Sequence, residues 1–141
     1  MSAIRPANAD DVAAICRFDH IAQADTGARR EFVVRSVAAG SCYVLVADKQ
    51  VVAYGVLDYS FYACGFIAML LVDARYRRRG YGLLLLRHME SVCRTPKLFT
   101  STSLSNLPMQ SLLNKLGYAL SGVIHNLDEN DPELVYYKLL G

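Results

Sequence analysis

The 141-residue sequence predicts a single mixed α/β domain over residues 1–141, with about seven strands and about four helices. The first supporting observation is the order of the predicted elements: a strand, two helices, three strands, a helix, a strand, a helix and two strands. The second is their connection, because short turns join most strands and one strand–helix–strand crossover implies a parallel pair. The third is composition, since 53% hydrophobic and 20% charged residues are typical of a globular chain.

The first third of the chain predicts a short strand and two helices. Residues 3–6 predict the strand, and Asn8 is a suitable cap for a helix with an acidic first turn. A second helix is predicted over residues 28–39, with Gly40 as its stop. The polar segment Gln23–Gly27 connects the two helices and could border a ligand site. Helical spacing marks the side chains expected to face the core: Val12, Ile15, Cys16, Val33, Val34 and Val37.

The middle of the chain is rich in strand-forming residues. Strands are predicted over residues 42–47 and 51–58, with a tight turn at residues 48–50 between them. The stretch Tyr59–Gly65 predicts a loop rich in aromatic residues. The continuous apolar run Phe66–Val72 predicts a strand that is buried on both faces.

The last third of the chain alternates helices with strands. In its first helix, Leu85, Met89 and Val92 share one face. The predicted elements are a helix over residues 81–94 before Pro96, a strand over 98–103, a helix over 106–116 before Gly117, and strands over 118–124 and 133–139 joined by a polar turn at 126–132.

The net charge, the apolar runs and the cysteine pattern indicate which partners and which cellular compartment to expect. The net charge of +2 is too small to indicate a nucleic-acid partner, and the longest apolar run is too short to cross a membrane. The N-terminus lacks the apolar core of a signal peptide. Scattered histidines and cysteines without CxxC spacing predict reduced thiols and no metal site. We therefore expect a soluble cytoplasmic protein, either a monomer or a homodimer.

The segment Arg75–Leu83 carries the clearest functional signal. A predicted strand leads through an arginine-rich loop into a helix, and Gly80 and Gly82 lie where the loop becomes the helix. Glycines allow close approach of a ligand, helix N-termini favour anions, and arginines offer fork-shaped donors. Neither a Walker loop nor a complete G-x-G-x-x-G is present, since Leu85 occupies the third glycine position. The pattern predicts a phosphate or pyrophosphate site, with a solvated arginine loop as the alternative.

Two motifs resemble those of the GNAT superfamily of acetyl-CoA-dependent N-acetyltransferases. The segment Arg77-Arg78-Arg79-Gly80-Tyr81-Gly82 matches the pattern [RQ]-x-x-G-x-[GA]. The segment 106–118 is similar to the later motif N-x-x-A-x-x-L-Y-x-K-x-G-[FY]. The resemblance implies the GNAT fold, with a central, mostly antiparallel twisted sheet. The residues of the later motif that match in register are Asn106, Leu112, Lys115, Gly117 and Tyr118.

The resemblance implies acetyl-CoA as co-substrate. In the family, the loop amides hold the pyrophosphate, the strand backbone pairs with the pantetheine arm, and this arm enters a gap between splayed strands. Asn106 would bond the pantetheine region, whereas Lys115 and Gly117 fit equally well as the charge and stop of a helix end. The implied cofactor residues are Leu70, Leu71, Val72, Arg77, Arg78, Arg79, Gly80, Tyr81, Gly82, Leu83, Asn106, Met109 and Lys115.

The resemblance further implies direct transfer of the acetyl group to a primary amine of a small-molecule or peptide acceptor. Many family members carry a tyrosine proton donor and a strand carboxylate at positions held here by Leu113 and by the carboxylate-free segment around Ala68. Neither side chain transfers a proton, so the acid and base stay unassigned. The weak candidates are Tyr118, Tyr136 and Glu133, followed by Tyr137, Asp58 and His125.

An aromatic cluster precedes the strand that the resemblance assigns to the cofactor. Tyr59, Phe61 and Tyr62 could line an acceptor pocket or hold a cation, or could form a hydrophobic lid over a sheet edge. A GNAT-fold sensor that binds acyl-CoA with little catalysis is the alternative to an enzyme. A nucleic-acid-binding domain would need more than one short basic cluster.

Overall fold

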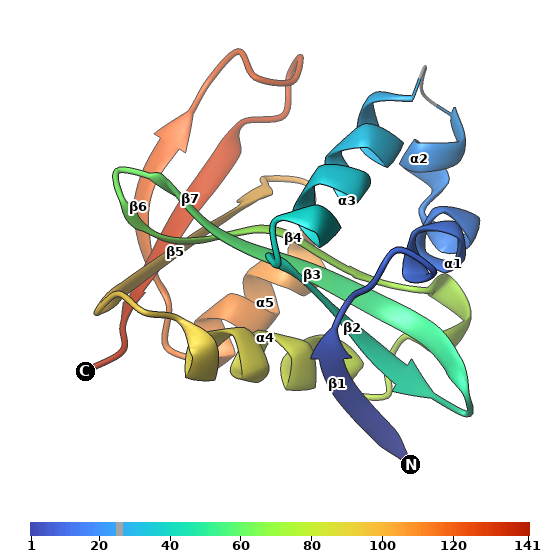
Figure 1. The fold of residues 1–141 in the computed structure, drawn as a ribbon. Coiled ribbons are helices and arrows are strands. Elements are labelled where there is room, and N and C mark those ends of the chain that lie inside the picture. Colours follow the sequence, from blue (N-terminus) through green and yellow to red (C-terminus); the bar gives the residue numbers. More distant parts are fainter. Residues whose placement is uncertain (25–26) are drawn as a thin grey trace. The chain divides into compact units, whose positions relative to one another are not determined.

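The computed structural model describes residues 1–24 and 27–141. Over these residues the chain forms seven strands, five α-helices and one 3-10 helix (Figure 1). The strands form a sheet in the order β1-β2-β3-β4-β5-β7-β6. The β4–β5 pair is parallel, whereas β1–β2, β2–β3, β5–β7 and β6–β7 are antiparallel, which confirms the predicted mixed class. In chain order the elements are β1 (Ser2–Pro6), α1 (Asp11–Phe18), α2 (His20–Ala24), α3 (Ala28–Ala38), β2 (Cys42–Ala47), β3 (Gln50–Phe61), β4 (Cys64–Val72), η1 (Ala74–Tyr76), α4 (Tyr81–Val92), β5 (Lys97–Ser103), α5 (Leu107–Lys115), β6 (Ala119–Ile124) and β7 (Glu133–Leu139).

The chain divides into two compact units. The first unit consists of Met1–Leu57 and Met69–Ser91, and the second of Asp58–Ala68 and Val92–Gly141. Strands β3 and β4 therefore contribute residues to both units. Each unit contains buried apolar side chains of its own.

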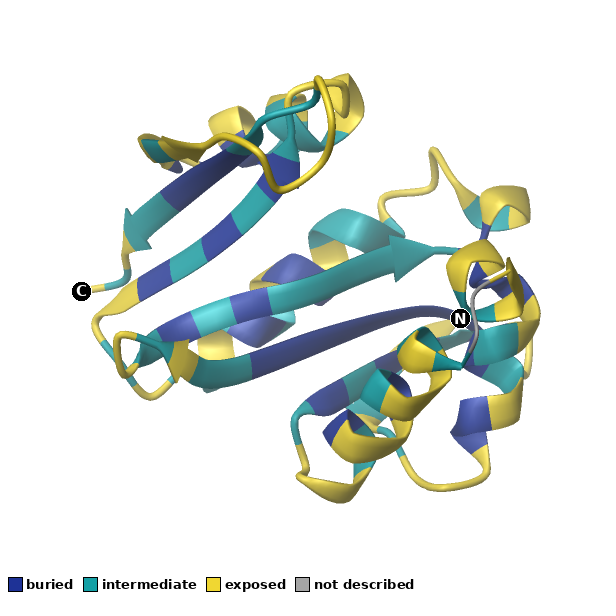
Figure 2. Ribbon diagram, turned by 90° about the horizontal axis from the view of Figure 1, so that it is seen from above, coloured by how far each residue is buried: buried dark blue, intermediate teal, exposed yellow. Residues whose placement is uncertain are grey.

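In the first unit, helices cover both faces of strand β3. Neighbouring residues of a strand point to opposite faces, so Tyr54 and Gly55 show what lies on each side. The Tyr54 hydroxyl reaches Asp19 at the end of α1. Gly55 faces α4 instead, since a Cβ built there would lie 2.8 Å from the Met89 Cε atom. Helices α1 to α3 and helix α4 thus lie on opposite faces of this part of the sheet (Figure 1). Buried residues follow the strands and the inner faces of the helices (Figure 2), and the fully buried ones include Ile15, Val33, Val44, Leu45, Val52, Leu85, Leu86 and Met89.

In the second unit, strands β5 and β7 present two faces of different character. Tyr136 pairs with Thr100 and Leu134 with Thr102, and all four side chains are buried. The alternate residues of β5 and β7 form the other face: Phe99, Ser101, Ser103, Glu133, Val135 and Tyr137.

Helices α1 and α3 differ from the predictions in their capping and in the residues that face inward. Helix α1 begins at Asp11, and Asn8 lies outside it, accepting a hydrogen bond from the Asp10 N–H at 3.0 Å. In α3, Val33 is buried as expected, but Val34 is 44% exposed. Ser36 takes the inward position instead, because its hydroxyl donates to the Phe32 carbonyl oxygen and is thereby satisfied.

Helix α2 was not predicted and makes the count of described helices five rather than four. The Asp19 carboxylate accepts hydrogen bonds from the Ile21 and Ala22 N–H groups and so satisfies the start of this short helix. The predicted polar connection Gln23–Gly27 therefore begins inside α2, and its residues 25 and 26 lie outside the described residues.

Strands β3 and β4 are longer than predicted. The expected aromatic loop is mostly strand, and only Tyr62 and Ala63 form the turn, with φ values of 52° and 59°. The prediction failed because two-residue turns of this kind normally carry Asn or Gly, and neither occupies these positions. The expectation that Phe66–Val72 is buried on both faces was also wrong, since only Ile67 of this run is buried.

Helix α4 ends at Val92, which is half-buried, whereas Leu85 and Met89 are buried as predicted. The four cysteines are free thiols, and burial raises the pKa of Cys42 to about 12. Among the described residues, no helix combines the length and apolarity needed to cross a membrane. In the same part of the chain, no group of His, Cys, Asp and Glu has the arrangement of a metal site.

Candidate functional site

The first unit contains the predicted sequence of strand, basic loop and helix. Strand β4 ends at Val72, and Asp73 fixes the start of the loop. The Asp73 N–H donates to the Val52 carbonyl oxygen of β3 at 2.8 Å, and the Asp73 carboxylate accepts from the backbone N–H of Arg75 at 3.1 Å. Burial raises the pKa of Asp73, but the Arg75 backbone and guanidinium hydrogen bonds outweigh it and lower the pKa overall. The Asp73 backbone thus ties the loop to β3, and the buried Asp73 carboxylate fixes the first turn of the loop.

The arginines of this loop form an exposed basic surface. The guanidinium groups of Arg75 and Arg79 lie over the Tyr76 ring, with Cζ atoms 5.9 Å and 4.9 Å from its centroid. The Arg77 Nε–H donates to the Val72 carbonyl oxygen at 3.2 Å. These contacts involve the guanidinium groups, and the arginine residues nevertheless stay exposed. The loop therefore presents several cationic groups next to the start of α4.

The backbone of the loop turns sharply just before α4. Arg78 has a φ of 64° and Gly80 a φ of 80°, both in the left-handed region. The Leu84 N–H donates to the Gly80 carbonyl oxygen at 3.1 Å, which is the first bond of the helix. The N–H groups of Tyr81, Gly82 and Leu83 precede that bond and have no intrahelical acceptor. Because the first turn contains no acidic residue, its positive dipole end is not offset by the helix itself.

The second unit contains the remaining predicted cofactor residues on α5. Asn106 caps this helix, and its Oδ1 atom accepts a hydrogen bond from the Met109 N–H at 3.2 Å. The cap uses the amide oxygen, whereas the Asn106 NH₂ group provides two further donors. Lys115 is exposed in the last turn, and Gly117 follows with a φ of 88°. For Gly117, the structural role as the end of the helix is confirmed.

The candidate acid and base residues occupy ordinary structural positions. Tyr118 and Tyr136 are both buried in the second unit. Glu133 is half-buried, and its Oε2 atom accepts a hydrogen bond from the Ser101 hydroxyl at 2.6 Å. Leu113, at the position of the family tyrosine, is completely buried and serves packing. The structure does not bring these residues together as a recognisable proton-transfer pair.

The lower-ranked candidates also have local explanations. The Asp58 carboxylate accepts from the Ser60 hydroxyl at 2.9 Å. The Tyr137 ring packs against Phe99, with centroids 5.7 Å apart. His125 is exposed beyond the end of β6.

The first unit contains a buried polar network that the sequence did not indicate. The Tyr54 hydroxyl donates to the Asp19 carboxylate at 2.6 Å, and Arg29 of α3 forms an ion pair with the same oxygen at 2.9 Å. Asp19 is only 1% exposed. The Arg29 Nη1 atom also lies 3.8 Å from the Met69 Sδ atom of β4. The segments around residues 19, 29, 54 and 69 meet here, and no spacing motif reveals such a meeting.

Asp19 stays ionised in this network. Burial raises the pKa of its carboxyl, but hydrogen bonds from Tyr54 and from backbone N–H groups, together with the Arg29 charge, outweigh burial and lower the pKa overall. For Tyr54, burial and the bond to the Asp19 carboxylate raise the pKa of the phenol. A tyrosine with a raised pKa remains a hydrogen-bond donor at neutral pH, so the network is a structural tie with defined protonation.

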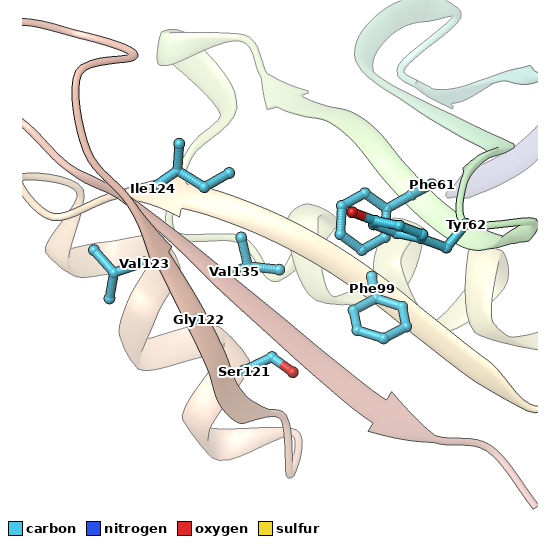
Figure 3. A pocket seen from close by; sticks show the side chains of 8 residues that line it. All are labelled: Phe61, Tyr62, Phe99, Ser121, Gly122, Val123, Ile124 and Val135. Atoms are coloured by element: carbon cyan, nitrogen blue, oxygen red, sulfur yellow. The ribbon is translucent and has the colours of Figure 1, made fainter.

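The aromatic cluster separates into two parts. The Tyr59 hydroxyl accepts a hydrogen bond from the Arg94 N–H at 3.0 Å, and the Arg94 guanidinium lies 4.2 Å from the Tyr59 ring centroid. Phe61 and Tyr62 instead line a pocket on the second unit, with a volume of about 290 Å³ (Figure 3). Binding of the acceptor in this pocket, one of the roles that the sequence leaves open, stays a prediction.

The sequence profile of the Acetyltransferase (GNAT) family matches residues 10–118. A crystal structure of a GNAT-family acetyltransferase from Bacillus cereus is 34% identical to this chain, with a TM-score of 0.90, and the match covers 99% of this chain and 97% of that one. No curated protein matches the sequence significantly.

Two more distant structures share the fold. The ribosomal-protein-S18-alanine N-acetyltransferase from Escherichia coli is 17% identical, with a TM-score of 0.82 over 100% of this chain and 95% of that one. Arabidopsis thaliana Naa50, in complex with the bisubstrate analogue CoA-Ac-MVNAL, is 18% identical, with a TM-score of 0.78 over 97% of each chain. The family profile, the Bacillus cereus structure and the loop before α4 agree. This chain belongs to the GNAT family of acetyltransferases.

Proposed function

We propose that this acetyltransferase moves the acetyl group of acetyl-CoA directly to a primary amine of a small-molecule or peptide acceptor. The observation that carries the proposal is the start of α4. Exposed arginines of the loop directly precede helix N–H groups that have no intrahelical acceptor. Such a site suits the pyrophosphate of coenzyme A. The Arabidopsis thaliana structure described above was solved with the bisubstrate analogue CoA-Ac-MVNAL.

Within this proposal, the loop and the strand before it have separate tasks. The loop Arg77–Gly80 and the first turn Tyr81–Leu83 bind the pyrophosphate. The backbone of Leu70–Val72, which is half-buried, pairs with the pantetheine arm. For Asn106, Met109 and Lys115, contact with the cofactor stays a prediction of the family motif. The single-domain organisation, the cytoplasmic location and a monomeric or homodimeric state remain predictions.

Thermal unfolding with acetyl-CoA, CoA and ATP as separate ligands tests the cofactor assignment. A ligand present at about 100 times its dissociation constant stabilises the folded protein by about 2.7 kcal/mol. We therefore expect the midpoint to rise by about 5 to 15 °C with acetyl-CoA and CoA. ATP should produce a much smaller rise, because it lacks the pantetheine arm. Absence of any rise with acetyl-CoA at saturating concentration would exclude the proposed cofactor site.

Substitution of Gly82 locates that site. Gly82→Glu places a bulky carboxylate in the first turn of α4, so the thermal shift with acetyl-CoA should disappear while the free protein still folds. Ser91→Glu is the matched control, because it adds the same charge at an exposed position near the other end of α4. The control should keep the full shift. An unchanged thermal shift in Gly82→Glu would show that the cofactor binds elsewhere.

Asn106 offers a way to separate a capping role from a binding role. Asn106→Asp keeps an oxygen that caps α5 but removes both NH₂ donors. Asn106→Ser also keeps the cap and adds no charge. If Asn106 binds the pantetheine region, both variants should melt like the parent without ligand and should lose affinity for CoA. If affinity stays within about twofold, Asn106 is a cap alone.

A further inference from the structure

The pocket of the second unit is an apolar trough on one face of its strands. Its walls come from four segments: the turn after β3, and strands β5, β6 and β7 (Figure 3). Phe61 and Phe99 lie close together, with ring centroids 5.1 Å apart, and Tyr62 meets Phe61 edge-on at 4.9 Å. The trough is lined by Phe61, Tyr62, Phe99, Ser121, Gly122, Val123, Ile124 and Val135. It therefore offers aromatic faces at one end and aliphatic side chains at the other.

A carboxylate lies on the same face as the aliphatic end of the trough. Glu133 and Val135 are two residues apart on β7, so their side chains point to the same face. Glu133 is also the direct partner of Ile124 on β6. The Ser101 hydroxyl donates to one carboxylate oxygen at 2.6 Å, and a carboxylate can accept several more hydrogen bonds. Thus the apolar trough has an oriented negative charge beside it.

The turn between β3 and β4 places an unusual residue, Tyr62, at the trough. Tyr62 and Ala63 both have positive φ, in a two-residue turn that favours Asn and Gly. Tyr62 is 86% exposed, so burial does not explain a bulky residue in this conformation. Its ring is instead one wall of the trough (Figure 3). Tyr62 is unfavourable for the turn, and the position of its ring in the trough wall explains its presence there.

We infer that this trough and Glu133 bind the acceptor of the proposed transfer, a small primary amine that carries an aromatic ring. The volume of about 290 Å³ suits one ring-sized group rather than a larger ligand. The ring packs against Phe61, Tyr62 and Phe99, and the ammonium group forms a charge-assisted hydrogen bond with the Glu133 carboxylate. The carboxylate takes the ammonium proton, and the neutral amine then attacks the thioester carbon. The new C–N bond replaces the C–S bond, and CoA leaves as the thiol. This inference rests on the proposed acetyl transfer, because only that reaction makes the bound amine an acceptor. Binding of the amine to the trough can nevertheless be measured without any cofactor.

Three small ligands separate the contributions of ring and charge. 2-Phenylethylamine has both, 2-phenylethanol has the ring alone, and ethylamine has the charge alone. Chemical-shift titration of the free protein should give saturable binding of 2-phenylethylamine, with shifts confined to the trough residues. Each of the other two ligands should bind at least about tenfold more weakly. Equal affinity for all three ligands, or shifts outside the trough, would overturn the inference.

Substitution of Gly122 tests the location without disturbing the fold. Gly122 lines the trough on β6, and a Cβ built there meets no atom within 4 Å. Gly122→Val therefore fills the trough and suits a strand better than glycine does. This variant should melt no lower than the parent and should lose binding of 2-phenylethylamine. Leu120→Ala is the control on the same strand, since Leu120 is exposed outside the trough, and it should bind normally.

Two further variants test the charge and the aromatic wall. Glu133→Gln keeps an oxygen for Ser101 and removes the charge, so it should weaken 2-phenylethylamine at least about tenfold and leave 2-phenylethanol unchanged. Tyr62→Asn places a preferred residue in the turn, so the variant should be at least as stable as the parent while its affinity falls. Unchanged affinity in both variants would contradict the inference.

The parallel measurement with acetyl-CoA separates two kinds of failure. If acetyl-CoA raises the melting midpoint but 2-phenylethylamine does not bind, the proposed function stands and the acceptor assignment is wrong. If acetyl-CoA has no effect, the proposed function itself fails. A peptide with an N-terminal phenylalanine that binds more than about tenfold tighter than 2-phenylethylamine would replace the small-molecule acceptor by a polypeptide.

Discussion

The Tyr54 hydroxyl and the Asp19 carboxylate are joined by a 2.6 Å hydrogen bond in the buried part of the first unit. Asp19 also accepts from Arg29 and from the first N–H groups of α2, so a single carboxylate connects α1, α2, α3 and β3. A hydrogen bond to a charged group contributes about 1.5 to 3 kcal/mol to stability. Loss of this one hydrogen bond should therefore weaken the packing of several elements.

Tyr54→Phe removes the hydroxyl and leaves the ring in place. We expect the free energy of unfolding to fall by about 1.5 to 3 kcal/mol in urea titrations at pH 7. Tyr62→Phe is the control, because Tyr62 is exposed and its change should stay within about 0.5 kcal/mol. Equal effects of the two substitutions would show that the Asp19 bond adds no stability.

Acid should weaken the first unit through Asp11 and Asp19. Hydrogen bonds from Arg5 lower the pKa of Asp11 below its ordinary 3.8. For Asp19, burial raises the pKa, but its hydrogen bonds outweigh burial and lower the pKa below the same value. A carboxyl whose pKa is lower in the folded state contributes its stability above the unfolded pKa and loses it as the pH falls through the folded pKa.

The contribution of both carboxylates should accordingly be complete above about pH 5 and decline steadily below about pH 4. Urea unfolding at pH 7, 5, 4 and 3 measures this decline. Asp19→Asn should be less stable than the parent at pH 7 and should show a shallower decline toward pH 3. Parallel curves for the two proteins would mean that Asp19 has the same pKa in the folded and unfolded states.

Two substitutions of Arg78 separate its backbone strain from its charge. Arg78 has a φ of 64°, where glycine is favoured over residues with a Cβ. Arg78→Gly should be more stable than Arg78→Ala by about 0.5 to 1 kcal/mol, because alanine keeps the strain. Both lose the guanidinium and should weaken acetyl-CoA equally, as measured by titration calorimetry. A much weaker affinity in Arg78→Gly alone would show that loop rigidity matters more than charge.

Gly65 allows β4 to lie directly against the segment that follows α4. A Cβ at this position would lie 2.4 Å from the Cys93 Sγ atom, so something must move in Gly65→Ala. We expect a loss of about 1 to 3 kcal/mol in the free energy of unfolding. Cys93→Ala should restore part of that loss when combined with Gly65→Ala. Strict additivity of the two substitutions would indicate that the thiol is not the obstacle.

The elements with a strong local pattern were predicted well from the sequence. The basic loop and α4 follow directly from residues 75–92, where arginines, glycines and apolar spacing agree. Strands β2 and β7 have the predicted limits because alternating and β-branched residues end at clear turns. The predicted cofactor residues come from the family motif, and composition alone could not name them.

The remaining features depend on contacts between distant residues. Nothing around Asp19 in the sequence indicates that Tyr54 and Arg29 meet it, because residues 19, 29 and 54 are brought together only by packing. The turn at Tyr62 was missed because its residues violate the usual preference. The trough joins four segments of the chain, so its side chains could be named as aromatic but not as neighbours.

The contact between Gly55 and Met89 has a consequence for oxidative damage. The glycine leaves room for little more than the Met89 sulfur and methyl group, which hold α4 close to β3. Conversion of that sulfur to a sulfoxide would add a polar oxygen in a buried apolar space. The helix would then have to move away from the strand, and the arginine loop at its start would move with it. Because Met89 is completely buried, peroxide would reach its sulfur only when α4 opens away from β3. Oxidation of this one residue would therefore make such an opening lasting.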